Sequence, residues 1–370
     1  MTQKYADSIL PNLTIKEATE LQFKLLDNVT KVFKYNSFFE TGDVGLHPEH
    51  NRPKTTALVE QVLSATFNTE ACALVRGSGT GAIRIALSKV VQPGDSVIVH
   101  TAPMYTTTKD TFHLMGLKQN PVNFNDEQQL RTVLEADRSS KVFYIQHARQ
   151  QPTDTYSIKG VIQKVKTLRP ELCVIVDDNY CAMKMKGIGV EYGADVSTFS
   201  GFKLLGPEGI GIILGSTSLI EKIHLQNYSG GGQVQGHEAH ELLRSMAFAP
   251  VMLAIQNEQV ELLCDRLNKN ELPFVKEAYI TNSQSKNVIL ELEIPIAQEV
   301  IAKASAHGAA TYPVGAESKY ELLPMIYRVS GSFIESNPEL KNFGIRINPM
   351  KSSADTIIRI LKEVFAEIRG

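Results

Sequence analysis

Short apolar runs alternate with amphipathic stretches through the first two thirds of the chain. The runs ACALVRG, DSVIVH, KVFYIQH and ELCVIVDD contain consecutive apolar residues without in-and-out alternation, which is typical of strands buried on both faces of a parallel sheet. Segments such as TGAIRIALSKVV lie between them and carry apolar residues at helical spacing. The alternation predicts an α/β fold, a mostly parallel open sheet with helices on both faces.

The N-terminal part begins with a predicted helix. Thr14 and Glu17 have the spacing of a capping box, and apolar residues follow at intervals of three and four. A loop rich in glycine and histidine, TGDVGLHPEHNRP, comes next, and a second helix is expected from Leu58 to Phe67.

After about residue 240 the pattern changes. One long helix is expected from His237 to Leu267, with Pro250 disturbing its middle. The strands NVILELEI, MIYRVSG and FGIRINP and the helices 297–307 and 354–368 complete a smaller α+β domain. We therefore predict an N-terminal helix and loop packing on the small domain (1–45), a large domain (46–245) and a small C-terminal domain (246–370).

Composition excludes several classes of protein. Lys and Arg number 38 against 40 Asp and Glu, a formal charge of −2, and no basic run provides a footprint for nucleic acid. No apolar stretch reaches the ~18 residues of a membrane span, and the first residues lack a signal-peptide pattern. The four cysteines are scattered without CxxC or Cys/His spacing, so we expect a cytoplasmic protein with reduced thiols and no metal centre.

In an open parallel sheet, ligands bind at the carboxyl ends of the strands, and four motifs follow predicted strands. The first is RGSGTGAI, in which Gly77, Gly79 and Gly81 allow close approach of a phosphate to a helix N-terminus. A tight strand-to-helix turn needs glycine in any case. The motif also fits a dinucleotide fingerprint, but Asp95 opens the next strand and His100 closes it, which argues against nicotinamide or flavin.

The second and third motifs offer a ring-stacking residue and an acidic pair. Tyr105 in TAPMYTTTKD is placed to stack on a flat ring, or is an ordinary half-buried tyrosine. In VIVDDNY, Asp177 or Asp178 stands at the mouth of the sheet, where a carboxylate is costly to desolvate unless a cation or protonated nitrogen faces it. The alternative is a helix cap made by Asp178 or Asn179.

The fourth motif is a lysine in the turn SGFKLLGPEG. Lys203 is flanked by apolar residues and glycines, and desolvation favours the neutral amine that forms a Schiff base. Ser200 adds a hydroxyl to an anion pocket. The alternative is a lysine that extends from a loop into solvent.

Taken together, SxxK before GPxGxG, the sequence DxxY and the upstream glycine turn resemble the fold-type I pyridoxal-phosphate (PLP) enzymes of the aspartate aminotransferase superfamily. The resemblance covers about residues 40 to 350. The stretch VDDNYC and Tyr105 before TTT resemble the cystathionine γ-synthase/methionine γ-lyase branch, and the whole sequence most resembles the YhfS-like group, regarded as aminotransferases.

The resemblance implies a role for each motif in binding pyridoxal 5'-phosphate. Lys203 would hold the cofactor in a Schiff base, and Asp177 rather than Asp178 would face the pyridine nitrogen, because DxxY then ends at Tyr180 near the phenolic oxygen. Asn179 would lie under the ring and Tyr105 on its other face. The phosphate would be held by Ser78, Gly79, Thr80 and Ser200.

Further roles concern the segment RQQPTDTYS, the substrate and the partner subunit. Gln151 stands where the family has an asparagine that contacts the phenolic oxygen, and His147 and Arg149 would touch substrate or phosphate, or be ordinary loop residues. Arg346 in FGIRINP would bind the substrate carboxylate, with Arg328 as second choice and a structural ion pair as the alternative. The resemblance also implies that the loop with Asp43 and Arg52 reaches a neighbouring subunit, hence a homodimer or homotetramer with shared sites.

The chemistry that follows removal of the α-proton is not decided by these motifs. The resemblance to the YhfS-like group favours an aminotransferase acting on an amino acid. A carbon–sulfur lyase or γ-replacement enzyme is the alternative, and a catalytically silent PLP-fold binding or regulatory protein is the second alternative. A sugar-phosphate or nucleotide-binding α/β protein without PLP would leave the lysine turn unexplained.

Overall fold

The computed structural model describes residues 4–229, 231–269, 271–283, 285–312, 317–329 and 332–369. The chain divides into two compact units. The large unit comprises residues 13–148 and 156–251, and the small unit comprises residues 1–12, 149–155 and 252–370. The functional division into 1–45, 46–245 and 246–370 stays a prediction.

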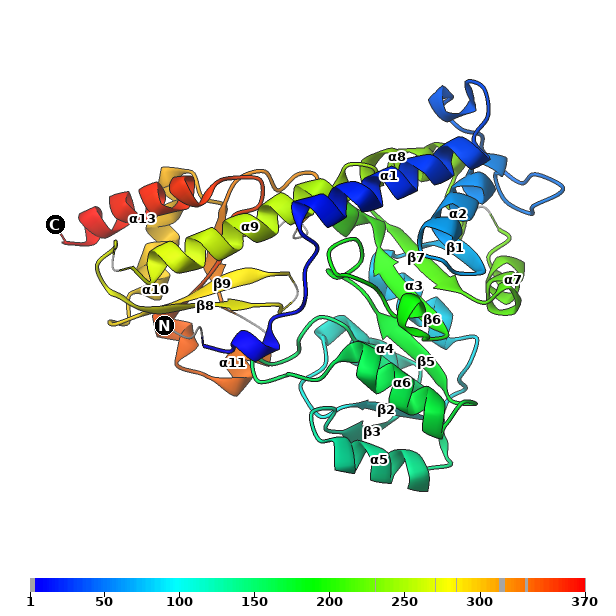
Figure 1. Cartoon of the computed structure of the whole chain (residues 1–370), viewed down its shortest axis with the longest axis horizontal. Coiled ribbons are helices and arrows are strands. Elements are labelled where there is room, and N and C mark those ends of the chain that lie inside the picture. Colours follow the sequence, from blue (N-terminus) through cyan, green and yellow to red (C-terminus); the bar gives the residue numbers. More distant parts are fainter. Residues whose placement is uncertain are drawn as a thin grey trace. The chain divides into compact units, whose positions relative to one another are not determined.

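The large unit is built on a seven-stranded sheet with the strand order β1-β7-β6-β5-β4-β2-β3. Six strands run parallel, and β7 runs antiparallel to both of its neighbours (Figure 1). The strands are β1 Ala71–Arg76, β2 Ser96–His100, β3 Lys118–Val122, β4 Ser140–Gln146, β5 Cys173–Asp177, β6 Val196–Ser200 and β7 Ile210–Gly215. The predicted mostly parallel α/β sheet is confirmed.

Helices cover both faces of this sheet. Along β4, Val142 and Tyr144 belong to a core shared with helices α3, α4 and α7, whereas Phe143 and Ile145 belong to a core shared with α5 and α6. Successive residues of a strand point to opposite faces, so each must be apolar, as the uninterrupted runs predict. The helices are α1 Ile15–Val32, α2 Lys54–Thr66, α3 Ser78–Leu87, α4 Thr106–Leu114, α5 Glu127–Ala136, α6 Ile158–Leu168, α7 Thr217–Gln226 and α8 Gly236–Met246, with 3₁₀ turns η2 Ser37–Phe39, η3 Val190–Tyr192 and η4 Gly201–Leu204.

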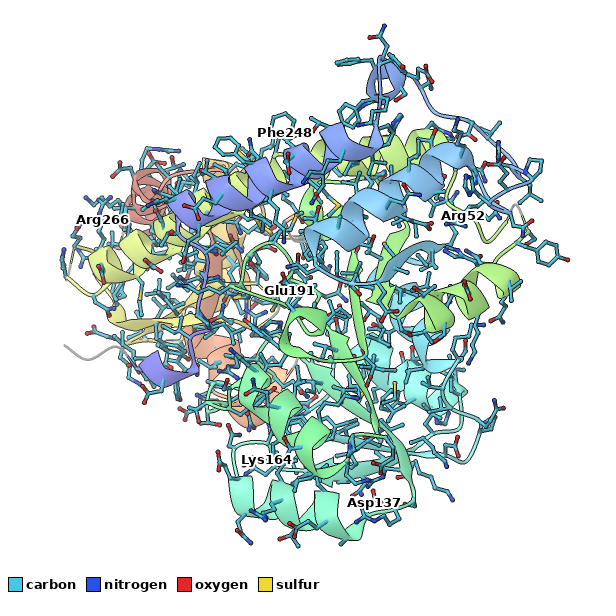
Figure 2. The ribbon with its side chains drawn as sticks, turned by 45° about the vertical axis from the view of Figure 1, so that its right-hand side comes forward. Arg52, Asp137, Lys164, Glu191, Phe248 and Arg266 are labelled. Carbon is cyan, nitrogen blue, oxygen red and sulfur yellow. The ribbon has the colours of Figure 1, made fainter. Side chains whose placement is uncertain are left out.

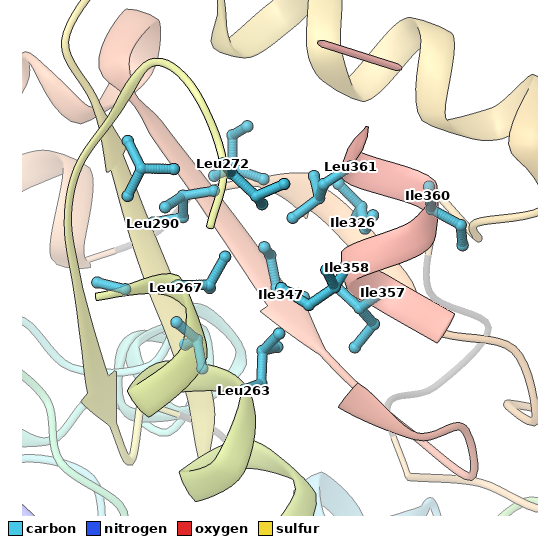
Figure 3. Packing of buried hydrophobic residues seen from close by; sticks show 14 of the residues in the cluster. Leu263, Leu267, Leu272, Leu290, Ile326, Ile347, Ile357, Ile358, Ile360 and Leu361 are labelled. Carbon is cyan, nitrogen blue, oxygen red and sulfur yellow. The ribbon is translucent and has the colours of Figure 1, made fainter. Parts of the chain in front are cut away.

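The small unit contains a four-stranded antiparallel sheet of order β10-β11-β9-β8. Apolar side chains of α9 and α13, among them Leu263 and Leu361, pack against Leu290 and Ile347 of the sheet (Figure 3). The elements are η1 Ala6–Ser8, α9 Ala249–Leu267, β8 Val275–Thr281, β9 Asn287–Leu292, α10 Ala297–Ala304, η5 Ser305–His307, β10 Met325–Arg328, α11 Ser332–Ser336, α12 Leu340–Phe343, β11 Gly344–Asn348 and α13 Ala354–Arg369.

Local sequence patterns predicted one helix start correctly and one helix incorrectly. The capping box is confirmed, because Thr14 accepts a hydrogen bond from the Glu17 N–H and the Glu17 carboxylate accepts one from the Thr14 N–H. The single helix from His237 to Leu267 is wrong, because α8 ends at Met246 and α9 starts anew at Ala249. Pro250 lacks an N–H and is tolerated in the first turn of a helix but not inside one. No helix within the described residues is both long and apolar enough to cross a membrane.

Candidate active site

The predicted site residues of the large unit lie where parallel strands end. Strand β1 leads into the glycine turn and α3, β5 ends at Asp177, and β6 ends at Ser200 directly before the turn η4 with Lys203. Because these strands run in the same direction, their carboxyl ends meet at one edge of the sheet, where ligands of such folds bind.

The glycine turn after β1 is tightly packed. Gly77 has a φ of +94°, and its N–H donates to the Gly209 carbonyl at 2.9 Å. A Cβ added at Gly79 would come within 2.4 Å of the Asn179 amide, so only glycine fits there. The first turn of α3, which includes Gly79 and Thr80, presents N–H groups that lack a preceding helical carbonyl, an arrangement suited to an anion.

Asp177 is a buried carboxylate held by three donors. Its Oδ1 accepts hydrogen bonds from the Asn179 N–H at 3.0 Å and the Asn179 Nδ2 at 2.6 Å. Its Oδ2 accepts one from the Tyr144 hydroxyl at 3.2 Å. Burial raises the pKa of Asp177, and the bonds from Asn179 only partly oppose this effect. A cationic partner would favour its ionised form.

Asp178 has a different environment. It is fully buried, and its Oδ1 lies 2.7 Å from Nδ1 of the buried His147. Both carboxylate oxygens also accept from the Gly189 N–H, at 3.3 and 3.2 Å. Asp178 therefore acts within the interior of the large unit, and His147 is its partner rather than a loop residue open to solvent.

Asn179 connects the acidic turn with the lysine turn. Its Nδ2 donates to Asp177, and its Oδ1 accepts from the Ser200 N–H at 3.0 Å. The same amide lies against the backbone of Gly79. Three predicted segments, namely the glycine turn, the strand end at Asp177 and the lysine turn at Ser200, are thus brought together through one amide side chain.

Lys203 lies in the 3₁₀ turn η4 and is half-buried. Its Nζ lies 4.1 Å from the centroid of the Tyr180 ring. Tyr180 ends the DxxY sequence and has a φ of +67°. Cβ atoms added at Gly201 or Gly206 would meet Leu242 of α8 at 2.4 and 2.7 Å, so close packing against α8 fixes the turn. The structure brings the lysine to the turn that carries Asp177.

Tyr105 and Thr80 lie at the starts of neighbouring helices. Tyr105 is the residue before α4 and is 41% exposed. Thr107 Oγ1 lies 3.0 Å from Thr80 Oγ1, which ties the first turn of α4 to that of α3. The stacking role of Tyr105 and the phosphate contacts of Ser78 and Thr80 stay predictions.

The remaining predicted residues of the RQQP segment belong to the small unit. Gln151 Nε2 donates to Asp154 Oδ1 at 2.9 Å, and Arg149 Nε donates to the Ser8 carbonyl at 2.9 Å. Arg149 is buried and its N–H donates to the Asn282 carbonyl, so it holds the local backbone. The contact of Gln151 with a cofactor stays a prediction.

Arg346 and Arg328 differ sharply in burial. Arg346, on β11, is 1% exposed, and its Nη2 lies 3.4 Å from Ser283 Oγ. Within the described part of the chain, its Nε has no hydrogen-bond partner and no carboxylate forms an ion pair with it. Arg328, at the end of β10, is exposed. A buried guanidinium with an unsatisfied N–H is suited to an anionic ligand.

Asp43 and Arg52 both have partners in their own chain. The Asp43 carboxylate accepts from the N–H groups of Lys54 at 2.6 Å and Thr55 at 2.9 Å, at the start of α2. Arg52 Nε donates to the buried Glu60 at 2.6 Å. Their predicted role toward a neighbouring subunit stays a prediction.

Sequence reasoning missed two residues of this region. Lys184 is 2% exposed, and its Nζ lies 5.9 Å from the Tyr180 ring centroid. Tyr144 donates to Asp177 from inside β4. A lysine in a turn is usually solvated, and a tyrosine in an apolar strand is usually an ordinary core residue. The sequence therefore contained no signal that marks Lys184 or Tyr144 as part of a site.

Comparison with known proteins identifies the family. The model of the Cys/Met metabolism PLP-dependent enzymes matches residues 28–286, and that of the YhfS-like C-terminal domain matches residues 261–361. Protein YhfS of Escherichia coli (strain K12) is 45% identical over 359 residues, covering 97% of this chain and 99% of that protein. The chain belongs to the Cys/Met metabolism PLP-dependent enzyme family. The resemblance to fold-type I PLP enzymes and the cofactor prediction are confirmed.

Solved structures agree with this assignment. The crystal structure described as the pyridoxal-5'-phosphate dependent protein YhfS from Escherichia coli has a TM-score of 0.94 at 45% identity and covers 97% of this chain and 98% of its own. Cystathionine gamma synthase from Xanthomonas oryzae pv. oryzae has a TM-score of 0.68 at 14% identity with 87% coverage of both chains, and shares the fold. The aminotransferase prediction gains no specific support from these relatives.

The residues of the large unit fit pyridoxal phosphate. The buried Asp177 carboxylate needs a cationic partner, which a protonated pyridine nitrogen supplies. Lys203 provides an amine beside the same turn, and the glycine cradle at Gly79 leaves no room for a side chain. These residues are therefore compatible with pyridoxal phosphate, and their individual contacts with it stay predictions.

Proposed function

We propose that the protein is a PLP-dependent carbon–sulfur lyase that acts on a sulfur-containing amino acid, and that Lys203 is its covalent anchor and proton-transfer residue. The match to the Cys/Met metabolism family over residues 28–286 supports a lyase better than an aminotransferase. Solved folds described as cystathionine gamma synthase and as a carbon-sulfur lyase from Clostridium novyi NT, with a TM-score of 0.71 at 16% identity, are compatible with it.

The proposed cofactor contacts are those that the family resemblance implies, and the grouping of Asp177, Asn179 and Ser200 at the strand ends supports them. Lys203 and Asp177 would bind the aldehyde carbon and the pyridine nitrogen, and Asn179 would hold Asp177 in place. Tyr180, beneath the Lys203 amine, would face the phenolic oxygen. The phosphate would bind the first turn of α3 at Ser78, Gly79 and Thr80 with Ser200, while Tyr105 and Gln151 would complete the contacts to the ring.

When bound, pyridoxal phosphate supplies an electron sink that stabilises negative charge on the substrate α-carbon. The chain's own residues then carry the proton transfers. Lys203 Nζ takes the α-proton and delivers a proton to the departing sulfur or to the product. The face of the Tyr180 ring lies 4.1 Å from Nζ and restricts where this amine can move. Asp177, held by Tyr144 and Asn179, stays ionised opposite a positive charge.

Arg346 is the proposed carboxylate-binding residue of the substrate. Its burial and unsatisfied Nε support this role, because a bidentate carboxylate would complete its hydrogen bonds. Arg328 is exposed and lacks this need.

The observation that carries the proposal is the position of the Lys203 amine over the Tyr180 ring. Tyr180 follows Asp177 by three residues in the sequence. The test incubates the PLP-loaded protein with L-cystathionine, L-cysteine or L-methionine in the absence of a keto acid. We expect ammonia, a keto acid and a thiol, and none of them from Lys203→Ala. Pyridoxamine phosphate formed without ammonia would instead identify an aminotransferase. No reaction and no cofactor absorbance change with any amino acid would identify a catalytically silent protein.

A further inference from the structure

The loop TGDVGLHPEHNRP carries Asp43 and Arg52, whose predicted role is toward a neighbouring subunit, and it also gathers metal-ligating side chains that have no role in the proposed function. His47, Glu49 and His50 each offer one ligand atom, and these atoms all lie within 4.8 Å of one another. Among the residues described, this is the only such group of three histidine, cysteine or acidic side chains. All three residues lie within positions 47–50 of one loop, so the conformation of this loop sets the distances between their side chains.

The two imidazoles have a spacing that suits a shared ion. The ring centroids of His47 and His50 are 5.3 Å apart, with 28° between the ring planes. Two imidazoles bound at about 2.1 Å to one tetrahedral zinc ion have their ring centres roughly 5 Å apart. Binding of an ion would require the stacked rings to rotate and Glu49 to turn toward them, over ligand-atom separations that are at most 4.8 Å.

Backbone hydrogen bonds keep this loop in place. The His47 N–H donates to the Arg52 carbonyl at 3.1 Å, and the His50 N–H donates to the His47 carbonyl at 3.1 Å. Arg52 Nη1 donates to the His50 carbonyl at 2.8 Å. Gln233 Nε2 donates to the Asn51 carbonyl at 2.6 Å and so ties the loop to a distant segment. Ligands on a braced backbone lose little conformational freedom on binding.

The loop carries charged side chains of both signs. Arg52, which lies just before α2 and is labelled in Figure 2, belongs to the loop and contacts the His50 carbonyl. Its Nε donates to the buried Glu60 carboxyl group at 2.6 Å. Glu49 is exposed and contributes a negative charge.

We propose that His47, Glu49 and His50 bind a divalent transition-metal ion, with Zn²⁺ as the best match. Two imidazole nitrogens and a carboxylate oxygen are a ligand set that zinc accepts, with water at the fourth position. Mg²⁺ and Ca²⁺ prefer all-oxygen ligands and do not fit this set. The expectation of no metal centre rested on the lack of cysteine ligand spacing, and this loop contains no cysteine.

The test is a calorimetric titration of chelator-treated, PLP-loaded protein with Zn²⁺ alone. We expect about one equivalent to bind, and His47→Ala and His50→Ala each to weaken this binding on the order of 100-fold. His113→Ala is the matched control, since His113 is exposed at the end of α4 and belongs to no such group. Its binding of Zn²⁺ should equal that of the wild type.

Substitution with Co²⁺ identifies the ligands independently of affinity. A cobalt spectrum of nitrogen and oxygen ligands that disappears in His47→Ala supports the proposal. A sulfur-to-cobalt charge-transfer band would place the ion on a cysteine instead, and binding unchanged in both histidine variants would also overturn the proposal. Neither readout depends on the lyase activity, so this inference and the proposed function can fail separately.

Discussion

His147 Nδ1 lies 2.7 Å from Asp178 Oδ1, and both side chains are buried. The neighbouring Asp177 instead accepts from Tyr144 and Asn179, and its pKa is raised by burial. The two carboxylates are adjacent in the sequence, but they have different hydrogen-bond partners and therefore different surroundings. This contrast leads to opposite expectations for the two residues.

Asp177→Asn and Asp178→Asn should separate cofactor binding from stability. Asp177→Asn removes a buried charge that burial disfavours, so the cofactor-free protein should be as stable as wild type or up to about 1 kcal/mol more stable. Its affinity for pyridoxal phosphate should fall at least about tenfold. Asp178→Asn weakens a buried hydrogen bond with His147 and should lower the free energy of unfolding by about 1–3 kcal/mol.

Both effects are measured by chemical denaturation of cofactor-free protein and by titration with pyridoxal phosphate. The assignment of Asp177 to the cofactor is wrong if Asp178→Asn is the variant that keeps its stability and loses the cofactor.

Arg346→Ala and Arg328→Ala test the substrate-binding role. Loss of a buried guanidinium that pairs with a carboxylate should raise KM on the order of 100-fold, with a smaller effect on kcat. Arg328 is exposed, so its replacement should change KM by no more than about twofold. Arg346→Lys keeps the charge without the bidentate geometry and should recover only part of the loss. Steady-state kinetics with the best sulfur amino acid measures all three, and the reverse order of effects would assign the role to Arg328.

Gly79→Ala tests the cradle beside Asn179. The new Cβ would lie 2.4 Å from the Asn179 amide, which is held by Asp177 and by the Ser200 N–H. Displacing the amide should cost about 1–3 kcal/mol, so affinity for pyridoxal phosphate should fall roughly tenfold or more. Gly231→Ala is the control, because a Cβ there meets nothing within 4 Å. Equal affinities of the two variants would contradict the packing argument.

Glu60 and His224 should give opposing pH dependences of stability. Burial raises the pKa of Glu60 to about 7 despite the Arg52 charge, and burial with the Arg52 charge lowers the pKa of His224 to about 4. Folded Glu60 keeps its proton over the range from 4.5 to about 7, so its stabilising contribution is lost as pH rises through this range. The contribution of His224 is lost as pH falls from 6.5 toward about 4.

The two contributions nearly cancel in the wild type, since each is on the order of 3 kcal/mol. Relative to wild type, the stability of Glu60→Gln should therefore rise with pH between about 5 and 7, and that of His224→Gln should fall. Urea unfolding at both pH values gives the slopes. If stability changes with pH equally in the wild type and both variants, the pKa of neither group shifts on folding.

The sequence by itself determined most strands of the large sheet and the places along the chain where the strand-end motifs lie. Continuous apolar runs identify strands buried on both faces, because each successive residue meets a different core, as Val142 and Phe143 do. The lysine turn and the glycine turn are also local, since their residues are close in the chain. Strand β3, Lys118–Val122, was not predicted, because its residues are largely exposed and form no continuous apolar run.

Only the tertiary structure decided which of several similar residues has a given environment. Asp177 and Asp178 are indistinguishable in VDDNY, and their difference comes from His147 and Tyr144, more than thirty residues away. Arg346 and Arg328 both lie in apolar strands, but one is buried in the small unit and the other is exposed. Burial and hydrogen bonding depend on contacts between distant segments, and the spacing of residues along one chain does not encode those contacts.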